Sequence, residues 1–87
     1  MEEKQIREEL YGLMENRLRR NNKRPGDIDE SKSLLEQGIY DSMAFIELIA
    51  DVEEAFAIEI DFENLDAADF TSINQMTYLI QKSRDSQ

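Results

Sequence analysis

The sequence predicts an all-α fold, a small bundle of three main helices and one short helix. Three long segments carry apolar residues at helical spacing, and residues that begin or end helices flank them. The chain has 87 residues, enough for one small domain and too few for two. Residues 1–87 are therefore expected to form a single domain.

The first helix is predicted over residues 3–20. Acidic residues come early in this segment and basic residues late, an order that suits the helix macrodipole. Its apolar positions have helical spacing: Ile6, Leu10, Leu13, Met14 and Leu18. The sequence NNKRPG, residues 21–26, ends the helix and opens a loop over residues 21–41. Ile28, Leu34 and Leu35 are the apolar points expected to attach this loop to the core.

The second helix is predicted over residues 42–56, with one face packed and the other acidic. The apolar stripe consists of Ile46, Ile49, Val52 and Phe56, widened by Phe45 and Leu48. The opposite side carries Glu47, Asp51 and Glu54.

Apolar and acidic residues alternate in IEIDFENLD, residues 58–66, as they do in an edge strand. A lone strand has no partner here, so a turn and a short helix over residues 62–67 are predicted instead. The last helix is predicted over residues 72–83, because Ser72 and Gln75 have the spacing of a capping box. Its expected buried residues are Ile73, Met76, Leu79 and Ile80.

Composition excludes several classes of function. The chain has no cysteine and no histidine, so it has no thiolate metal site, no disulfide and no histidine base. The segment DIDESKSLLEQG, residues 27–38, begins like a calcium loop but has Lys32 at the glycine position and Gly38 at the bidentate glutamate position. We therefore expect no metal site. Pairs of carboxylates alone favour a solvated surface over an enzyme.

The charge is unevenly distributed along the chain, whose net charge is −10. Residues 1–24 hold seven basic and five acidic side chains, whereas residues 25–87 hold three basic and fifteen acidic ones. Such an acidic field repels nucleic acid and attracts basic protein surfaces. The basic segment NRLRRNNKR, residues 16–24, lacks interleaved aromatics and is interpreted as a solvated helix end.

No apolar run in the sequence is long enough to cross a membrane, and MEEKQIREEL is too charged for a signal peptide. A cytoplasmic protein is therefore expected, and nothing in the sequence requires more than a monomer.

The pair Asp41-Ser42 follows Gly38 and directly precedes the apolar run of the second helix. Either residue would serve as a helix cap, which is the most common use of Asp and Ser at this position. A nucleophilic serine needs a base, and the chain has no histidine to provide one. The remaining chemical use is as an acceptor, because a phosphodiester on Ser42 would lie at the positive end of the helix.

The stretches GIYDSMAFIELIADVEEAFAIEI and DFENLDAADFTSINQMTYLI together resemble the acyl carrier protein family, over residues 34–80. The resemblance rests on the Asp-Ser-Met signature, the Glu-Glu-x-Phe helix end, the Ile-x-Ile turn and the Phe-Thr-Ser-Ile segment before the last helix. It implies that a phosphopantetheinyl transferase uses coenzyme A to attach 4′-phosphopantetheine to Ser42, and that Asp41 assists this modification. Cargo would then be held as a thioester on this arm. The arm would supply the thiol, because the chain has no cysteine of its own.

The same resemblance makes the second helix the docking surface for partner enzymes. The implied contact residues are Met43, Ala44, Glu47, Asp51, Glu53 and Glu54, the acids among them meeting Arg or Lys of the partner. Two alternatives stay open here: Met43 as a core residue, and Glu53 or Glu54 as plain surface.

Details of the signature distinguish types of carrier. Fatty-acid carriers usually have glycine three residues before the serine and an acid two residues after it. In this chain Gly38 lies four residues before Ser42, and Ala44 occupies the position of the acid. Gly-x-x-Asp-Ser-Met is more similar to D-alanyl carriers and stand-alone peptidyl carriers, in which an adenylating ligase loads the arm and a downstream acyltransferase or synthase unloads it. The alternatives are a carrier for fatty acid or polyketide synthesis and, from another class, an unmodified acidic docking module.

Overall fold

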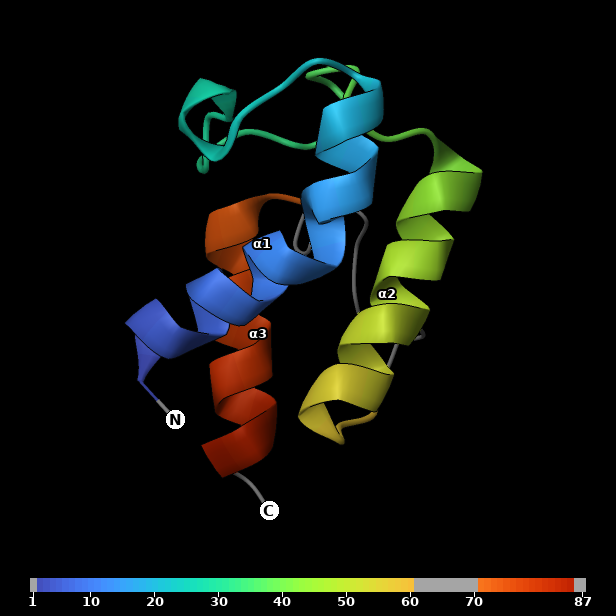
Figure 1. Cartoon of the computed structure of the whole chain (residues 1–87). Coiled ribbons are helices and arrows are strands. Elements are labelled where there is room, and N and C mark those ends of the chain that lie inside the picture. Colours follow the sequence, from blue (N-terminus) through green and yellow to red (C-terminus); the bar gives the residue numbers. More distant parts are fainter. Residues whose placement is uncertain (1, 61–70, 86–87) are drawn as a thin grey trace.

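The computed structural model describes residues 2–60 and 71–85 of the chain. This part contains the α-helices α1 (Glu3–Arg20), α2 (Ser42–Phe56) and α3 (Ile73–Asp85), the short 3-10 helix η1 (Pro25–Asp27), and no strand. α1 packs against both α2 and α3, and the long loop between α1 and α2 lies at one end of the bundle (Figure 1). The predicted all-α class is confirmed, while the short helix predicted over residues 62–67 lies outside the described residues.

α1 covers the residues that were predicted. Four apolar side chains, one per turn, are buried along it: Ile6, Leu10, Met14 and Leu18. The helix ends at Arg20 and Asn21 is its C-cap. The next residue, Asn22, has a φ of 54°, in the left-handed region that asparagine tolerates better than most residues. Leu13 is half-buried against the same core.

The long loop is attached to the start of α3. Ile28 and Leu34 are buried as predicted, and Leu35 is half-buried. The N–H of Leu34 donates to the carbonyl oxygen of Thr71 at 2.8 Å, and the N–H of Asn74 donates to the carbonyl oxygen of Glu30 at 3.0 Å. These backbone bonds hold the loop in place without any regular element of its own beyond η1.

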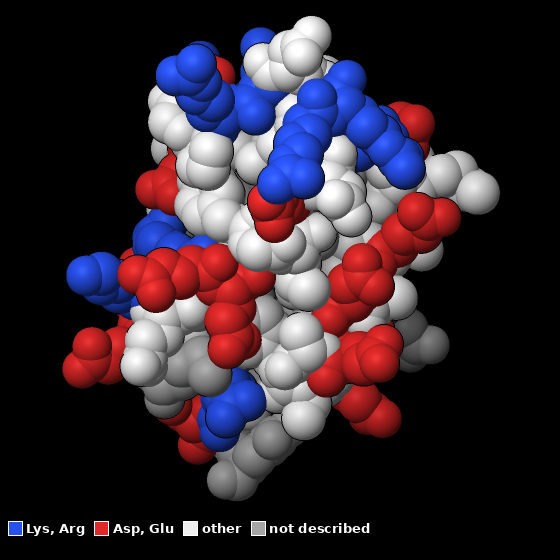
Figure 2. All heavy atoms as spheres, in the orientation of Figure 1, with Lys and Arg blue, Asp and Glu red and all other residues white. Residues whose placement is uncertain are grey.

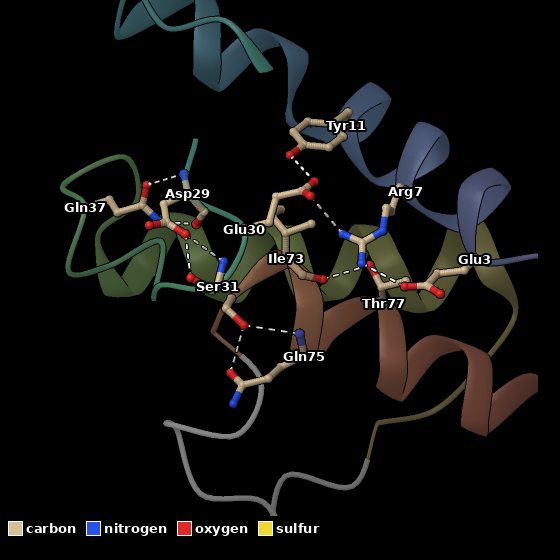
Figure 3. A network of polar contacts seen from close by, with 11 residues as sticks. Glu3, Arg7, Tyr11, Asp29, Glu30, Ser31, Gln37, Ile73, Gln75 and Thr77 are labelled. Carbon is tan, nitrogen blue, oxygen red and sulfur yellow. Dashed lines mark hydrogen bonds and ion pairs between the residues drawn. The ribbon is translucent and has the colours of Figure 1, made fainter. Parts of the chain in front are cut away.

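A polar network also fixes the loop to α1 (Figure 3). The carboxylate of Glu30 accepts a hydrogen bond from the Tyr11 hydroxyl at 2.6 Å and pairs with the Arg7 guanidinium at 3.2 Å. Arg7 also pairs with Glu3 at 2.8 Å. Burial, together with the Glu30 carboxylate, raises the pKa of Tyr11 above its ordinary value, so the phenol stays a donor to Glu30.

One prediction for α2 was wrong. The core face holds Phe45, Leu48, Ile49, Val52 and Phe56, but Ile46 is 67% exposed. Successive helical residues are rotated by about 100°, so Phe45 and Val52, seven apart, share a face that Ile46 cannot share. The buried stripe is centred on Phe45 and Val52, and an isoleucine is left on the surface.

α3 begins one residue after its predicted start, and it ends at Asp85. Ser72 caps it, because its hydroxyl oxygen accepts from the Gln75 N–H at 3.2 Å. Ile73, Met76 and Ile80 are buried as predicted, whereas Leu79 is half-buried. Thr77 is buried although it is polar. Its hydroxyl donates a hydrogen bond to the carbonyl oxygen of Ile73 at 2.8 Å, so no buried polar group is left unpaired there.

Candidate functional site

The two candidates for capping α2 have different roles in the structure. Asp41 is the N-cap: its backbone is extended, and its Oδ1 accepts a hydrogen bond from the Ala44 N–H at 2.8 Å. Ser42 is the first residue of the helix, and its hydroxyl takes no part in this cap. The capping reading of the Asp-Ser pair therefore applies to Asp41 and leaves Ser42 without that structural task.

Ser42 is exposed at the N-terminus of α2. Within residues 2–60 and 71–85, neither its hydroxyl nor the backbone N–H groups of Ser42 and Met43 has a hydrogen-bond partner. Free N–H groups and the helix dipole together favour an anion at this end of a helix. The position thus fits a phosphodiester on the serine oxygen, with room in solvent for an attached chain.

Arg17 of α1 holds the residues that lead into Ser42. Its Nε donates to the carbonyl oxygen of Ile39 at 3.0 Å, and its guanidinium pairs with the Asp41 carboxylate at 3.7 Å. The same guanidinium lies over the Tyr40 ring, 5.5 Å from its centre, close enough for a cation–π contact. One side chain therefore contacts three consecutive residues immediately before the serine.

Sequence reasoning missed this role, because it assigned Arg17 to a solvated basic helix end. A signal was present, however: Arg17 lies one turn after Leu13 and Met14 and is adjacent to Leu18, at the border of the buried face of α1. Asn21 supports the same contact, since its Nδ2 donates to the carbonyl oxygen of Ile39 at 3.4 Å.

The role of Tyr40 was also missed. This residue holds the segment before Ser42 against the core. Only 6% of it is exposed, and its ring meets the Phe45 ring edge-on, with centres 6.2 Å apart and planes at 90°. Burial raises the pKa of Tyr40 to about 12, with Arg17 lowering it and Asp51 raising it further. Tyr40 is therefore an uncharged phenol near neutral pH, and its packing fixes where the helix begins.

The surface of α2 beyond Ser42 combines apolar and acidic side chains. Met43 is 74% exposed, so it is not a core residue, and Ala44 is half-buried. Glu47, Asp51 and Glu54 are all exposed, as predicted for the outer face. Figure 2 shows acidic side chains in a row over α2, with basic ones gathered over the end of α1.

Glu53 differs from the other acids of α2. It is half-buried, and its Oε2 accepts a hydrogen bond from the Ile60 N–H at 3.0 Å. This bond ties the residues after α2 back onto the helix. Of the acids predicted to meet partners, Glu53 thus has an internal structural task.

Two features of the described residues bear on other classes of function. No three of their acidic side chains are grouped closely enough to hold a metal ion. None of their helices has the length and hydropathy that a membrane span requires.

Comparison with known proteins adds two findings. The family described as "Phosphopantetheine attachment site" matches residues 8–80 of the chain. The D-alanyl carrier protein of Lactococcus lactis subsp. lactis is 35% identical over 57 residues, which cover 66% of this chain and 72% of that protein. No solved structure gives a significant match.

Proposed function

The chain belongs to the family of carrier domains that bear a phosphopantetheine attachment site, and on this premise we propose that Ser42 is the attachment residue. A member of this family is a non-catalytic carrier, and its prosthetic group is 4′-phosphopantetheine. When attached, that group supplies the thiol that this cysteine-free chain lacks. The observation that carries the proposal is the exposed hydroxyl of Ser42 at the start of α2, which has no hydrogen-bond partner among residues 2–60 and 71–85 and lies next to an aspartate that already caps the helix.

The attachment makes few demands on the chain itself. A phosphopantetheinyl transferase would bring coenzyme A, and the Ser42 oxygen would form a bond to the phosphorus next to pantetheine. The bond to the adenosine bisphosphate leaving group would break, and a base of the transferase would accept the hydroxyl proton. Asp41 would assist this step. Support comes from its Oδ2, whose only partner among the described residues is Arg17 in a loose 3.7 Å pair, while Oδ1 caps the helix.

Partner enzymes would dock on the exposed face of α2. Met43 and Ala44 follow the serine, and the exposed Ile46, which was predicted to be buried, adds a further apolar side chain to this face. Glu47, Asp51 and Glu54 would pair with Arg or Lys of the partner. Exposed pairs of this kind are individually weak and are screened by salt, which suits a carrier that must leave each partner.

The cargo that best agrees with these features is an aminoacyl group, loaded by an adenylating ligase and removed by an acyltransferase or synthase. The D-alanyl carrier protein noted above supports this choice, as does the Gly-x-x-Asp-Ser-Met signature over residues 38–43. Phe45 supports it too, because this large side chain fills the core beneath the start of α2, where a long acyl chain would need space.

The test measures intact mass in two steps. The protein is first incubated with coenzyme A and a broad-specificity phosphopantetheinyl transferase, and then with ATP and either D-alanine and a D-alanine ligase or a fatty acid and a fatty-acyl ligase. We expect the mass of one arm to be gained first, and then one alanyl group in preference to a fatty acyl group. Preferential fatty acylation would favour fatty acid or polyketide synthesis, and no arm on folded protein would favour an unmodified docking module.

A further inference from the structure

A small groove runs along the seam between α1 and α2, on the side of α2 that faces away from the proposed attachment residue. Its volume is about 180 Å³, and Ala44, two residues after Ser42, is part of its wall. At roughly 30 Å³ for each molecule of liquid water, this is the space of about six waters. The groove is therefore of a size for a small polar group.

The two walls of the groove carry opposite charges. Glu47 and Asp51 line it from α2, and Arg17 and Arg20 line it from α1. Arg17 is already engaged with Asp41, as described above. Within the described part of the chain, Glu47, Asp51 and Arg20 have no ion pair closer than 4.0 Å and no side-chain hydrogen bond. The groove thus presents free anions on one side and a free cation on the other.

The acids lie within reach of an arm attached to Ser42. Glu47 and Asp51 follow Ser42 by five and nine residues on the same helix, which places them about 8 and 14 Å along its axis at about 1.5 Å per residue. Both acids are also rotated by about 140° and 180° around the helix from Ser42, so the arm would have to pass around the first turn of α2 to reach them. The end of the arm, rather than its phosphate, would reach the two carboxylates.

We infer that this groove holds the aminoacyl cargo, with its ammonium against Glu47 and Asp51 and its thioester carbonyl oxygen toward Arg20. The inference rests on the proposed function, and it specifies the cargo as a small group with a free ammonium. An aminoacyl thioester has a cation and a carbonyl acceptor on neighbouring carbons, which matches walls of opposite charge. A hydrocarbon cargo would desolvate the charged side chains without pairing them, so it would stay outside.

The experiment uses the full chain, loaded from acyl-coenzyme A by a broad-specificity transferase. Three arms are compared: alanyl, propionyl, which lacks the ammonium, and lactyl, which replaces it with a hydroxyl. Backbone amide signals are recorded by nuclear magnetic resonance for each form. We expect the alanyl form to shift the signals of residues 16–20 and 44–51 relative to the unloaded arm, and the two neutral forms to leave them unchanged.

Charge-neutralising variants locate the contact. In Glu47→Gln/Asp51→Asn the alanyl-dependent shifts should fall by more than half, while the matched control Glu54→Gln, an exposed acid of the same helix outside the groove, should keep them. Equal shifts with alanyl, propionyl and lactyl arms in the parent protein, or no shift with any of them, would overturn the inference. A parent protein that takes up no arm at all would instead contradict the proposed function, and the mass spectrum separates the two failures.

Discussion

At the scale of single residues, the site depends on how tasks are divided around Ser42. Asp41 caps α2, Tyr40 packs beneath it, and Arg17 contacts the chain just before the serine. Each of these contacts leaves the serine hydroxyl exposed while fixing the backbone that carries it. A transferase would therefore meet an ordered acceptor, and ordering before the reaction lowers the entropy lost in the transition state.

Replacing Arg17 by Met should slow modification without abolishing the fold. The variant loses a charged hydrogen bond to Ile39 at 3.0 Å and the pair with Asp41. The guanidinium is partly exposed, so we expect a loss of about 1 kcal/mol in the free energy of unfolding. kcat/KM for phosphopantetheine transfer should fall several-fold, measured by mass spectrometry at several carrier concentrations.

Arg19→Met is the matched control, because Arg19 pairs only with Glu15 on the exposed side of α1 among the described residues. It should leave both the free energy of unfolding and the transfer rate near their parent values. Equal transfer rates for Arg17→Met and Arg19→Met would show that contacts to residues 39–41 do not position the serine.

At the scale of elements, the end of α2 has an identifiable cause in its backbone and in a neighbouring helix. α2 ends at Phe56, and the capping residue after it, Ala57, adopts a left-handed conformation with φ of 55° and ψ of 47°. Arg84 of α3 donates to the carbonyl oxygen of Phe56 at 2.7 Å, so the end of α2 is also held by its neighbour. Glycine is the usual residue at this kind of helix end, since a Cβ is disfavoured there.

The substitution Ala57→Gly should stabilise the protein. Relief of the left-handed strain outweighs the greater freedom of glycine in the unfolded chain, for a net gain of about 0.5–1 kcal/mol in the free energy of unfolding. Urea unfolding of the parent and the variant measures this difference in the free energy of unfolding. Ala55→Gly, in the last turn of the same helix, is the control and should destabilise by up to about 1 kcal/mol. A loss of stability in both variants would refute the strain at Ala57.

Much of the element level was predictable from the sequence. The bounds of α1 and α2 and the cap at Ser72 follow from local periodicity and capping chemistry, which act between near neighbours in the chain. The exposure of Ile46 and the burial of Thr77 were not predictable in this way. They depend on which part of each helix meets the others, and a helix with apolar residues around more than half of its circumference does not specify that orientation.

In the candidate site, too, local motifs were predictable from the sequence and contacts between distant residues were not. The proposed attachment residue was visible as a local motif, and so was the acidic face of α2. Arg17 and Tyr40 were missed, because the contact from Arg17 to Ile39 spans 22 residues and depends on how the loop returns to α1. Glu53 was predicted to be a docking acid. Its hydrogen bond to Ile60 was not predictable, because that bond depends on how the chain turns after α2.

At the scale of the whole molecule, charge is the dominant property. The net charge is −10, and all of the negative excess lies in residues 25–87. The few ion pairs of the described residues are mostly exposed and contribute little individually. Repulsion among the remaining acids therefore opposes folding, while the same field attracts basic partners.

Added sodium chloride should raise the melting temperature, because screening weakens this repulsion more than it weakens the few ion pairs. A gain of about 1 kcal/mol would raise the midpoint by about 4–8 °C for a domain of this size. Calorimetry at increasing salt measures the change, and Glu54→Gln/Glu59→Gln, which removes two exposed acids, should show a smaller rise. A steady fall with salt would mean that favourable ion pairs dominate.

The central claim is that Ser42 bears the phosphopantetheine arm, and locating the added mass tests it most directly. The protein is treated with coenzyme A and a transferase and then fragmented in the mass spectrometer, alongside Ser42→Ala and the loop control Ser31→Ala. We predict one arm on Ser42 in the parent and in Ser31→Ala, and none in Ser42→Ala. An arm on any other residue, or an arm retained by Ser42→Ala, would contradict the account.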